Sequence, residues 1–436
     1  MKKVYIAMAA DILHSGHLNV IKKGIELGEV IIGVLTDQAI ASYKRAPYFN
    51  FETRKQIFEN IKGVSKVISQ DSVDYSKNLL DLKPDFVVHG DDWRTGSQQN
   101  IREIVVETLK EWDGQLIEIP YTRGLSSKDV SLKMSRDLRS PDYRRPLLKK
   151  LLSLKRYLSV LEASNGLTGL IVENTKIQDE KNVIQREFDA MWISSLCDST
   201  FKGKPDIELV DLTSRLNTIN EIMEVTTKPI ILDGDTGGRE EHLIYNVRTL
   251  ERIGVSAIII EDKTGLKRNS LFGTSVKQTL EDPEVFAHKI KVAKDNLVTK
   301  DFMIFARLES LIAGFGVDDA MNRAKLYIAA GADGVMIHSK QKDGKEILEF
   351  MKLFRDFSKT IPIIVVPTTY NHMTESELSE AGANIIIHAN HLLRSAYPAM
   401  TKTAETILKN GRSLEVDDFC SPVKEIINLI PGVNND

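Results

Sequence analysis

A short stretch at residues 261–270, EDKTGLKRNS, brings acidic, cationic and amide-bearing side chains close together. It follows an apolar run at residues 257–260 whose composition predicts a buried strand. Ligands of α/β folds bind at the carboxyl ends of strands, where Glu261 and Asp262 stand. The acids could hold a divalent cation, and the groups after them could hold an anion. The stretch therefore predicts a site for a metal-bound phosphate or carboxylate, with loop donors from Lys263, Lys267, Arg268, Asn269 and Ser270.

Polar groups follow several other apolar runs in the second half of the chain. Asp233 and Asp235 place two carboxylates on one side of an extended segment, and with Glu261 they form an oxygen-rich set suited to Mg²⁺, directly or through waters. Acids without histidine or cysteine argue against zinc. A single acid after a strand more often caps the next helix. Five consecutive candidate strands that end in such groups favour a clustered site, made of Trp192 to Ser195, Asp233 and Asp235, Glu261, Arg307 and His338.

A histidine pair, His14 and His17, begins the first helical pattern of the chain. Residues three apart share one face of a helix, and the helix N-terminus beside them offers free amides to a phosphate. Imidazoles can donate to phosphate oxygens as charge builds during nucleotidyl transfer. An ordinary surface pair and half of a zinc site are the other interpretations. The strand pattern at residues 3–10 favours phosphate chemistry, because the pair then opens a βαβ unit.

Length and composition bound the class of protein. A chain of 436 residues with 42% hydrophobic residues and a net charge of −3 predicts a soluble globular protein of two or three domains. The near-balanced charge gives no indication of nucleic-acid binding. The two cysteines, Cys197 and Cys420, form neither a disulfide framework nor a metal cluster. No apolar run approaches a membrane span, and the apolar start of the chain runs into Asp11, which favours a strand over a signal peptide, so we expect a cytoplasmic protein.

Alternating strand and helix patterns predict an α/β fold in both halves. Residues 1–135 show five strand patterns with helices between them, which predicts a Rossmann-like, doubly wound domain. Residues 136–150 are basic and proline-punctuated, typical of a linker in which Arg144 and Arg145 are solvated. Residues 151–436 fit a (β/α)8 barrel of the TIM type. We expect its strands at residues 169–173, 190–194, 229–233, 257–261, 303–307, 334–338, 363–366 and 384–388.

The N-terminal motifs resemble those of cytidylyltransferases in the HxGH nucleotidyltransferase superfamily. The resemblance implies that His14 and His17 stabilise the transferring α-phosphate and that Lys44 binds a phosphate of the nucleotide or acceptor. It also implies a triphosphate site at a helix N-terminus with Arg123 and Ser126. A solvated cation at Lys44 and a simple turn at residues 92–93 are the alternatives. The matching residues are Asp11, His14, Gly16, His17, Lys44, Arg54, Asp91, Asp92, Trp93 and the segment from Gly124 to Ser127.

The motifs of the second half resemble those of the phosphoenolpyruvate mutase and isocitrate lyase superfamily, and of the mutases within it. The EDKxxxKxNS stretch is the most specific match. The resemblance implies Mg²⁺ on Asp233, with Asp235 and Glu261 in support. It implies that Lys267 closes the loop over the site and that Asp206 anchors it. Further implied substrate contacts are Trp192, the amides of Ser194, Ser195 and Leu196 for a carboxylate, and Asn269, Ser270, Arg307 and His338 for a phosphoryl group.

Two rival activities exist within that superfamily. Its carbon–carbon lyases use a cysteine in the loop, and residues 262–278 contain none. Phosphonopyruvate hydrolases are closer rivals, and they are expected to lack Asn269. The mutase is therefore the favoured interpretation, with a hydrolase or lyase as the alternative.

The order of the two halves resembles the fused enzyme of fosfomycin biosynthesis. It implies that one half makes phosphonopyruvate from phosphoenolpyruvate, while the other transfers CMP from CTP to a phosphonate and releases pyrophosphate. Both 2-hydroxyethylphosphonate and 2-aminoethylphosphonate fit as acceptor. A CTP-sensing module on a catalytic barrel is the alternative from another class. The barrel resemblance also implies a homo-oligomer, a dimer or tetramer, assembled through the barrel and its terminal helix.

Overall fold

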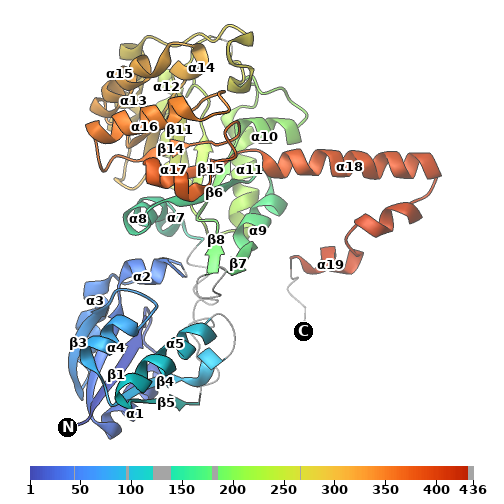
Figure 1. Ribbon diagram of the computed structural model, residues 1–436. Coiled ribbons are helices and arrows are strands. Elements are labelled where there is room, and N and C mark those ends of the chain that lie inside the picture. Colours follow the sequence, from blue (N-terminus) through green and yellow to red (C-terminus); the bar gives the residue numbers. More distant parts are fainter. Residues whose placement is uncertain (44, 95–97, 121–138, 179–184, 266, 431–436) are drawn as a thin grey trace. The chain divides into compact units, whose positions relative to one another are not determined.

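The computed structural model describes residues 1–43, 45–94, 98–120, 139–178, 185–265 and 267–430 (Figure 1). Contacts divide the chain into two compact units, Met1–Ala389 and Asn390–Asp436. The first unit contains a five-stranded parallel sheet and a closed eight-stranded parallel barrel. The predicted α/β class, with a Rossmann-like sheet followed by a barrel, is confirmed.

The N-terminal sheet has the strand order β3-β2-β1-β4-β5. Its inner strands β1, β2 and β4 are apolar on both faces, because helices cover both sides, as parallel sheets require. The order reverses between β1 and β4, so the carboxyl ends of these two strands mark the ligand-binding edge. The strands are β1 (Lys3–Met8), β2 (Glu29–Leu35), β3 (Val64–Gln70), β4 (Phe86–Gly90) and β5 (Gln115–Ile119), and the helices are α1 (Ser15–Leu27), α2 (Asp37–Ala41), α3 (Phe51–Glu59), α4 (Ser76–Leu82) and α5 (Gln99–Leu109), with 3-10 turns η1 (Asp91–Arg94) and η2 (Lys110–Trp112).

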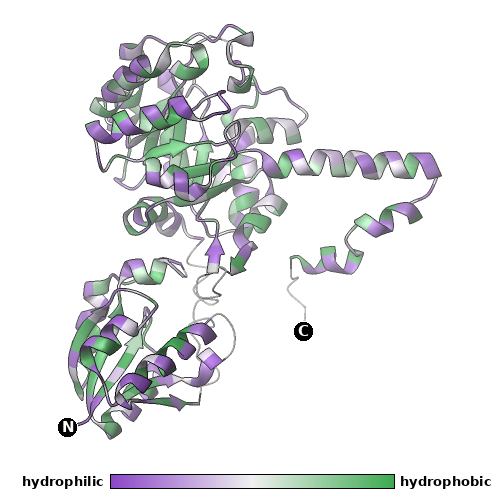
Figure 2. Cartoon of the chain, viewed as in Figure 1, coloured by the Kyte–Doolittle hydropathy of each residue, from purple (hydrophilic) through white to green (hydrophobic). Residues whose placement is uncertain are grey.

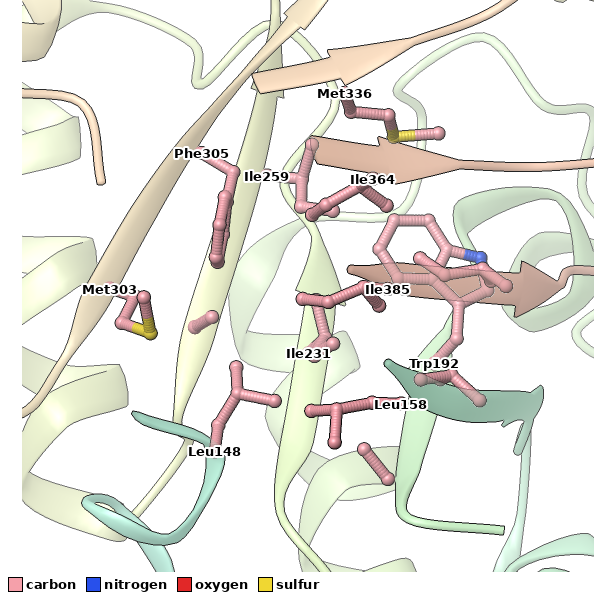
Figure 3. Packing of buried hydrophobic residues seen from close by; sticks show 14 of the residues in the cluster. Leu148, Leu158, Trp192, Ile231, Ile259, Met303, Phe305, Met336, Ile364 and Ile385 are labelled. Carbon is pink, nitrogen blue, oxygen red and sulfur yellow. The ribbon is translucent and has the colours of Figure 1, made fainter. Parts of the chain in front are cut away.

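The barrel closes in the order β10-β11-β12-β13-β14-β15-β6-β9. Side chains such as Trp192, Ile231 and Phe305 fill its interior (Figure 3), and the apolar strands lie inside the more polar helices (Figure 2). Such a filled interior leaves the chemistry to the carboxyl-terminal rim. The strands are β6 (Leu158–Glu162), β9 (Ala190–Ile193), β10 (Ile230–Asp233), β11 (Ala257–Glu261), β12 (Met303–Leu308), β13 (Gly334–Ile337), β14 (Ile363–Val365) and β15 (Ile385–His388).

Helices follow most barrel strands, and a small antiparallel hairpin of β7 (Lys176–Gln178) and β8 (Gln185–Glu187) lies outside the barrel sheet. The helices are α9 (Gly166–Asn174), α10 (Ser195–Phe201), α11 (Leu212–Val225), α12 (Glu240–Ile253), η3 (Ser270–Ser275), α13 (Pro283–Asp295), α14 (Ser310–Ala313), α15 (Gly316–Ala329), α16 (Lys345–Phe357) and α17 (Glu375–Ala381).

One predicted barrel strand is wrong. Residues 169–173 lie in the helix α9, and the first strand of the barrel is β6, which lies earlier in the chain. The reason is local. Asn165 caps α9, accepting from the Thr168 amide at 2.9 Å, and the Thr168 side chain closes a capping box in return. A capped start of this kind favours a helix, although the apolar run alone reads equally well as a strand.

The expected solvation of Arg144 and Arg145 is also wrong, because both side chains are buried. They belong to α7 (Pro141–Arg144) and to the turn before α8 (Leu147–Leu154). Arg144 donates to the carbonyl of Thr226, and Arg145 donates to the carbonyl of Glu251 at 3.0 Å. The Thr226 carbonyl lies just past the end of α11, and the Glu251 carbonyl lies in the last turn of α12, where carbonyl groups keep unused acceptor capacity. The leucines of α8 pack into the barrel core, so this segment closes the amino-terminal end of the barrel.

The second unit holds α18 (His391–Asn410), a 3-10 turn η4 (Leu414–Phe419) and α19 (Val423–Asn428). No residue of α18 is buried within the chain. Several large apolar side chains on it are exposed, including Tyr397, Met400 and Leu408. Among the described residues, no helix combines the length and apolar character needed to cross a membrane.

Candidate functional site

Carboxylates meet at the carboxyl-terminal rim of the barrel. Asp233 ends β10, and its Oδ2 accepts from the Ser195 amide at 3.2 Å and from the Ser195 hydroxyl at 2.9 Å. Burial raises the pKa of Asp233, but the charges of Lys267, Arg307 and Arg215 outweigh burial and hold the pKa at about 2. Asp233 is therefore ionised at neutral pH and is available to a cation.

Glu261 ends the neighbouring strand β11 and is 1% exposed. Neither of its carboxylate oxygens has a hydrogen-bond partner among the described residues. Its closest cations are Arg307 Nη1 at 3.5 Å and Lys263 Nζ at 3.7 Å. Burial raises its pKa to about 7. A buried carboxyl group with unused acceptors is suited to hold ordered water at a metal ion.

The three predicted metal-binding acids differ in availability. Asp235 accepts from Lys267 Nζ and, at 3.3 Å, from Arg215 Nη1, so its oxygens are occupied by cations. Within the described part of the chain, no three acidic, histidine or cysteine side chains converge as a direct metal-binding set. Mg²⁺ usually keeps several waters and binds through one or two carboxylates. The arrangement fits Mg²⁺ with Asp233 as direct ligand and Asp235 and Glu261 acting through water.

Lys267 joins the loop to the rim. Its ammonium group donates to Ser195 Oγ at 2.6 Å, to Asp206 Oδ1 at 2.9 Å and to Asp235 Oδ1. Nearby acids outweigh its burial and raise its pKa, so it stays protonated. Asn269 Nδ2 donates to the second oxygen of Asp206 at 2.7 Å. Asp206 thus holds two loop residues, and Asn269 is bonded to Asp206 rather than held free for a phosphoryl group.

Basic groups form the anion-binding end of the rim. Arg307 lies in β12 with Nε 2.5 Å from Glu309 Oε1, and Arg307 Nη2 donates to Ser270 Oγ at 2.7 Å. His338 follows β13 and is buried, and burial together with the charge of Arg307 lowers its pKa to about 4. Its Nδ1 is buried without a hydrogen-bond partner among the described residues. A neutral imidazole beside a guanidinium group could hold a phosphoryl group.

The remaining predicted barrel residues have other positions. Trp192 belongs to the hydrophobic core of the barrel (Figure 3). Ser194 is the N-cap of α10, and its hydroxyl accepts from the Cys197 amide at 3.4 Å. The amides of Ser194, Ser195 and Leu196 were expected to bind a carboxylate. In this structure the Ser195 amide donates to Asp233 instead.

The sequence interpretation gave no role to Arg215 and Glu309. Arg215 shares the buried face of α11 with Thr218, Ile219 and Ile222, and a cation on an apolar stripe was the signal that could have identified it. Its Nη2 donates to the Ile193 carbonyl at 3.3 Å, and Nη1 donates to the Asp233 carbonyl, so it fixes two adjacent strand ends. Glu309 follows Arg307 by two residues, and only the tertiary contacts reveal its function.

In the N-terminal domain, the rings of His14 and His17 lie against each other at the start of α1, with centroids 3.9 Å apart and planes tilted by 36°. The Nδ1 atom of His14 accepts from the Gly16 amide at 3.2 Å, and that of His17 accepts from the His14 amide at 3.3 Å. Burial lowers the pKa of His14. Because each Nδ1 accepts a backbone proton, the neutral rings carry their own protons on Nε2. Both Nε2 atoms are then donors suited to phosphate oxygens.

Arg54 is fully buried at the end of β1 and β2. It donates to the carbonyls of Ala9 at 2.9 Å, Leu35 at 2.7 Å and Phe49 at 3.0 Å, and pairs with Asp37 at 2.5 Å. These bonds occupy most of its guanidinium donors. We interpret Arg54 as a residue that fixes the ligand-binding edge rather than one that contacts substrate.

The other N-terminal residues surround the same edge. Asp11 accepts from the Phe49 amide at 3.0 Å and, with the two histidines and Asp92, lines a cavity there. Asp91 and Asp92 begin η1 directly after β4. Trp93 is buried, and its ring stacks on His89 with centroids 3.7 Å apart. Three expected contacts lie outside the described residues, namely Lys44, Arg123 and Ser126.

Glu118 anchors Trp93 and gives a stability prediction. It accepts from Trp93 Nε1 at 2.8 Å, Arg102 Nε at 2.9 Å and Arg94 Nη2 at 2.8 Å. The bonds from Arg102 foremost lower its pKa from 4.5 to about 2. Since the folded pKa lies below the unfolded value, the stabilisation is complete above pH 5 and is lost as the pH falls toward 2. We expect Glu118→Gln to lower the free energy of unfolding by about 2 kcal/mol at pH 7.

Urea unfolding of the N-terminal domain at pH 7 and pH 3 measures this effect. The difference between the wild type and Glu118→Gln should shrink at the lower pH. A difference that is equal at both pH values would mean that the carboxylate charge of Glu118 does not stabilise the fold.

The comparisons with known proteins agree with this two-part arrangement. The family described as cytidylyltransferase-like matches residues 9–131, and the family described as phosphoenolpyruvate phosphomutase matches residues 148–408. A phosphoenolpyruvate phosphomutase of Tetrahymena pyriformis is 35% identical over 65% of this chain and 89% of its own length. A phosphonopyruvate hydrolase of a Variovorax species is 34% identical over 65% of this chain and 93% of its own.

A solved structure extends the comparison to three dimensions. The crystal structure of a phosphonopyruvate hydrolase complex with oxalate and Mg²⁺ matches 66% of this chain and 94% of its own, with 31% identity and a TM-score of 0.57. Two thirds of the chain thus share sequence and fold with these proteins, and a cytidylyltransferase-like domain precedes that part. The chain belongs to the phosphoenolpyruvate phosphomutase family, and it is an enzyme that carries a cytidylyltransferase-like domain ahead of its barrel.

Proposed function

We propose that the barrel interconverts phosphoenolpyruvate and 3-phosphonopyruvate. The observation that supports a mutase most is the closure of the loop by Asp206, which bonds Lys267 at 2.9 Å and Asn269 at 2.7 Å. A loose, metaphosphate-like transfer is open to attack by water, so a closed loop favours delivery of phosphorus to carbon. The hydrolase relative is nearly as similar as the mutase relative, so identity alone does not separate the two activities.

The residues of the barrel rim have separate roles in this reaction. Asp233 would hold Mg²⁺, with Asp235 and Glu261 acting through water, and the ion would supply positive charge against the enolate and carboxylate oxygens. Arg307 and neutral His338 hold the phosphoryl group. The bond from phosphorus to the enol oxygen breaks, its electron pair forms the ketone, and C3 of the enolate bonds to phosphorus. Lys267 stays protonated throughout, because the acids around it hold its proton.

We further propose that the N-terminal domain transfers CMP from CTP to a phosphonate and releases pyrophosphate. His14 and His17 donate from Nε2 to the α-phosphate as the acceptor oxygen attacks it. The acceptor is a phosphonate such as 2-hydroxyethylphosphonate or 2-aminoethylphosphonate. The enzyme would then act in phosphonate biosynthesis, and we expect it to do so in the cytoplasm. A CTP-sensing domain would bind the nucleotide without releasing pyrophosphate, and a pyrophosphate assay with each acceptor distinguishes the two.

Phosphorus NMR of the purified protein with Mg²⁺ and phosphonopyruvate tests the barrel. A phosphoenolpyruvate resonance is the expected result. Inorganic phosphate together with pyruvate would make the barrel a hydrolase. An unchanged spectrum in a folded sample would exclude both activities and leave the lyases of the superfamily.

We also propose that the protein is a homo-oligomer, a dimer or tetramer, in which the second unit covers apolar surface of another copy. The exposed side chains of Tyr397, Met400 and Leu408 on α18 support this. We expect light scattering to give a mass two or four times that of the 49.0 kDa chain. The double variant Tyr397→Glu and Leu408→Glu should have a lower mass, and a monomeric wild type would contradict the proposal.

A further inference from the structure

The hydroxyl group of Ser270 has no capacity left for a substrate. It donates to Glu309 Oε2 at 2.7 Å. It accepts from Lys263 Nζ at 2.7 Å and from Arg307 Nη2 at 2.7 Å. A serine hydroxyl has one proton and two lone pairs. All three are used, so Ser270 in this arrangement connects protein groups and cannot also donate to a phosphoryl oxygen.

Glu309 stands at the centre of these contacts. It is fully buried, and its two oxygens take different partners: Oε1 faces Arg307 Nε at 2.5 Å, and Oε2 takes the Ser270 proton and lies 3.2 Å from Lys263 Nζ. Burial raises its pKa, but the charges of Arg307 and Lys263 outweigh burial and lower the pKa to about 2. Glu309 is therefore a carboxylate that can only accept hydrogen bonds, and its acceptance sets the direction of the Ser270 proton.

These bonds decide which part of Arg307 is left for a ligand. A guanidinium group has five N–H donors in a fixed plane. Glu309 takes the Nε donor and Ser270 takes one donor of Nη2. Among the described residues, none takes a hydrogen bond from the three other donors, on Nη1 and Nη2, and Nη1 lies 3.5 Å from Glu261. Glu309 and Ser270 thus fix the plane of the Arg307 guanidinium group. Its remaining donors form a fork suited to two phosphoryl oxygens.

We propose that Glu309 is a positioning residue for the phosphoryl end of the barrel site, acting through Arg307 and Ser270 without contacting the substrate. The inference rests on the proposed mutase and adds a residue to it. Glu309 sets the orientation of Arg307, and it supplies the negative charge that lets Arg307 and Lys263 lie close together. Without that charge, the two cations repel each other and Arg307 loses its fixed plane.

The substitution Glu309→Gln tests this role with little change in size. An amide still accepts from Arg307 through its oxygen, but its NH₂ group faces the Ser270 proton and the Lys263 ammonium, where it cannot accept. We expect kcat/KM for consumption of phosphonopyruvate to fall by about 10–100-fold. Oxalate with Mg²⁺ provides the second measurement, because oxalate has two carboxylates and no phosphoryl group. Its Kd, measured by calorimetry, should stay within about twofold of the wild type, since Glu309 acts on the other end of the site.

A matched control is Glu375→Gln. Glu375 is a largely buried barrel glutamate that accepts from Ser159 Oγ at 2.5 Å and from Arg186 Nη2 at 3.3 Å, and it lies 3.0 Å from His388 Nε2. It thus contacts three side chains, as Glu309 does, but none of the residues assigned to the barrel site. We expect this variant to keep the turnover and the oxalate affinity of the wild type. The variant Ser270→Ala should lower kcat/KM, and the double variant with Glu309→Gln should lose little more than Glu309→Gln alone.

The outcomes separate the inference from the function on which it rests. A wild type that forms phosphate instead of phosphoenolpyruvate would overturn the mutase, but consumption of phosphonopyruvate would still report on Arg307. Turnover by Glu309→Gln within threefold of the wild type would overturn the positioning role. Equal losses of turnover and oxalate affinity would also overturn it, because they would show a general collapse of the site.

Discussion

Replacing Asp206 with alanine is expected to abolish measurable formation of phosphoenolpyruvate, a loss of at least about 100-fold in kcat. The carboxylate bonds Lys267 and Asn269 at the same time, so its removal frees both residues of the loop. The barrel should remain folded, because Asp206 lies on the rim and does not belong to the core. Phosphorus NMR of the variant, together with its thermal unfolding curve, measures both expectations.

Asp206→Asn is the control for charge. It can still accept from one loop residue, and we expect an activity between those of the wild type and the alanine variant. We expect the alanine variant to form inorganic phosphate as a partial product, because an open loop admits water to the transferring group. Full turnover in a folded Asp206→Ala protein would remove Asp206 from the mechanism.

Replacing either histidine of the pair with alanine is expected to lower cytidylyl transfer by about 10²–10³-fold, the loss that follows removal of one preorganised donor from a transition state. His14→Ala and His17→Ala each remove one Nε2 donor. His14 is also the N-cap of α1 and accepts from the Gly16 amide, so its loss should additionally destabilise the helix start. Pyrophosphate release with CTP and each phosphonate acceptor is the measurement.

The same purified chain supplies the control for the histidine variants. The barrel should convert phosphonopyruvate at the wild-type rate in both, because the mutase residues lie in other elements. His14→Asn keeps a capping side chain, so it separates the loss of the cap from the loss of the phosphate donor. Normal pyrophosphate release by His17→Ala would contradict the assigned role of the pair.

The sequence was sufficient to predict the strands in which an apolar run is followed directly by polar residues of the site. At Ile260 and Glu261 an apolar run is followed at once by an acid, and the site of a parallel barrel lies at the carboxyl ends of its strands. One such acid could also cap a helix, but several consecutive strands with polar ends favoured a shared site. The same reasoning placed Asp233 and Arg307 at strand ends. A regular alternation of such strand patterns with helix patterns is enough to identify an α/β fold, so the fold class could be predicted without tertiary information.

The errors arose where a local pattern has two physical meanings. A buried arginine and a solvated one look alike in sequence, and the burial of Arg144 and Arg145 depends on carbonyls from distant elements. The helix at residues 169–173 was predicted as a strand because a short apolar run fits both. Glu309 was missed because its function depends on a hydrogen-bond network that closes only when the loop and two strands meet.

The helices α7 and α8 close the amino-terminal end of the barrel, and this closure limits where recombination could join the barrel to another domain. A genetic crossover at residue 151 would remove Arg144, Arg145 and Leu148 from the barrel and expose the carbonyls of Thr226 and Glu251. A crossover ahead of Ser140 would transfer α7 and α8 together with the barrel strands. The basic, proline-containing segment that begins at Ser140 therefore contributes to the core of the barrel and does not act only as a linker.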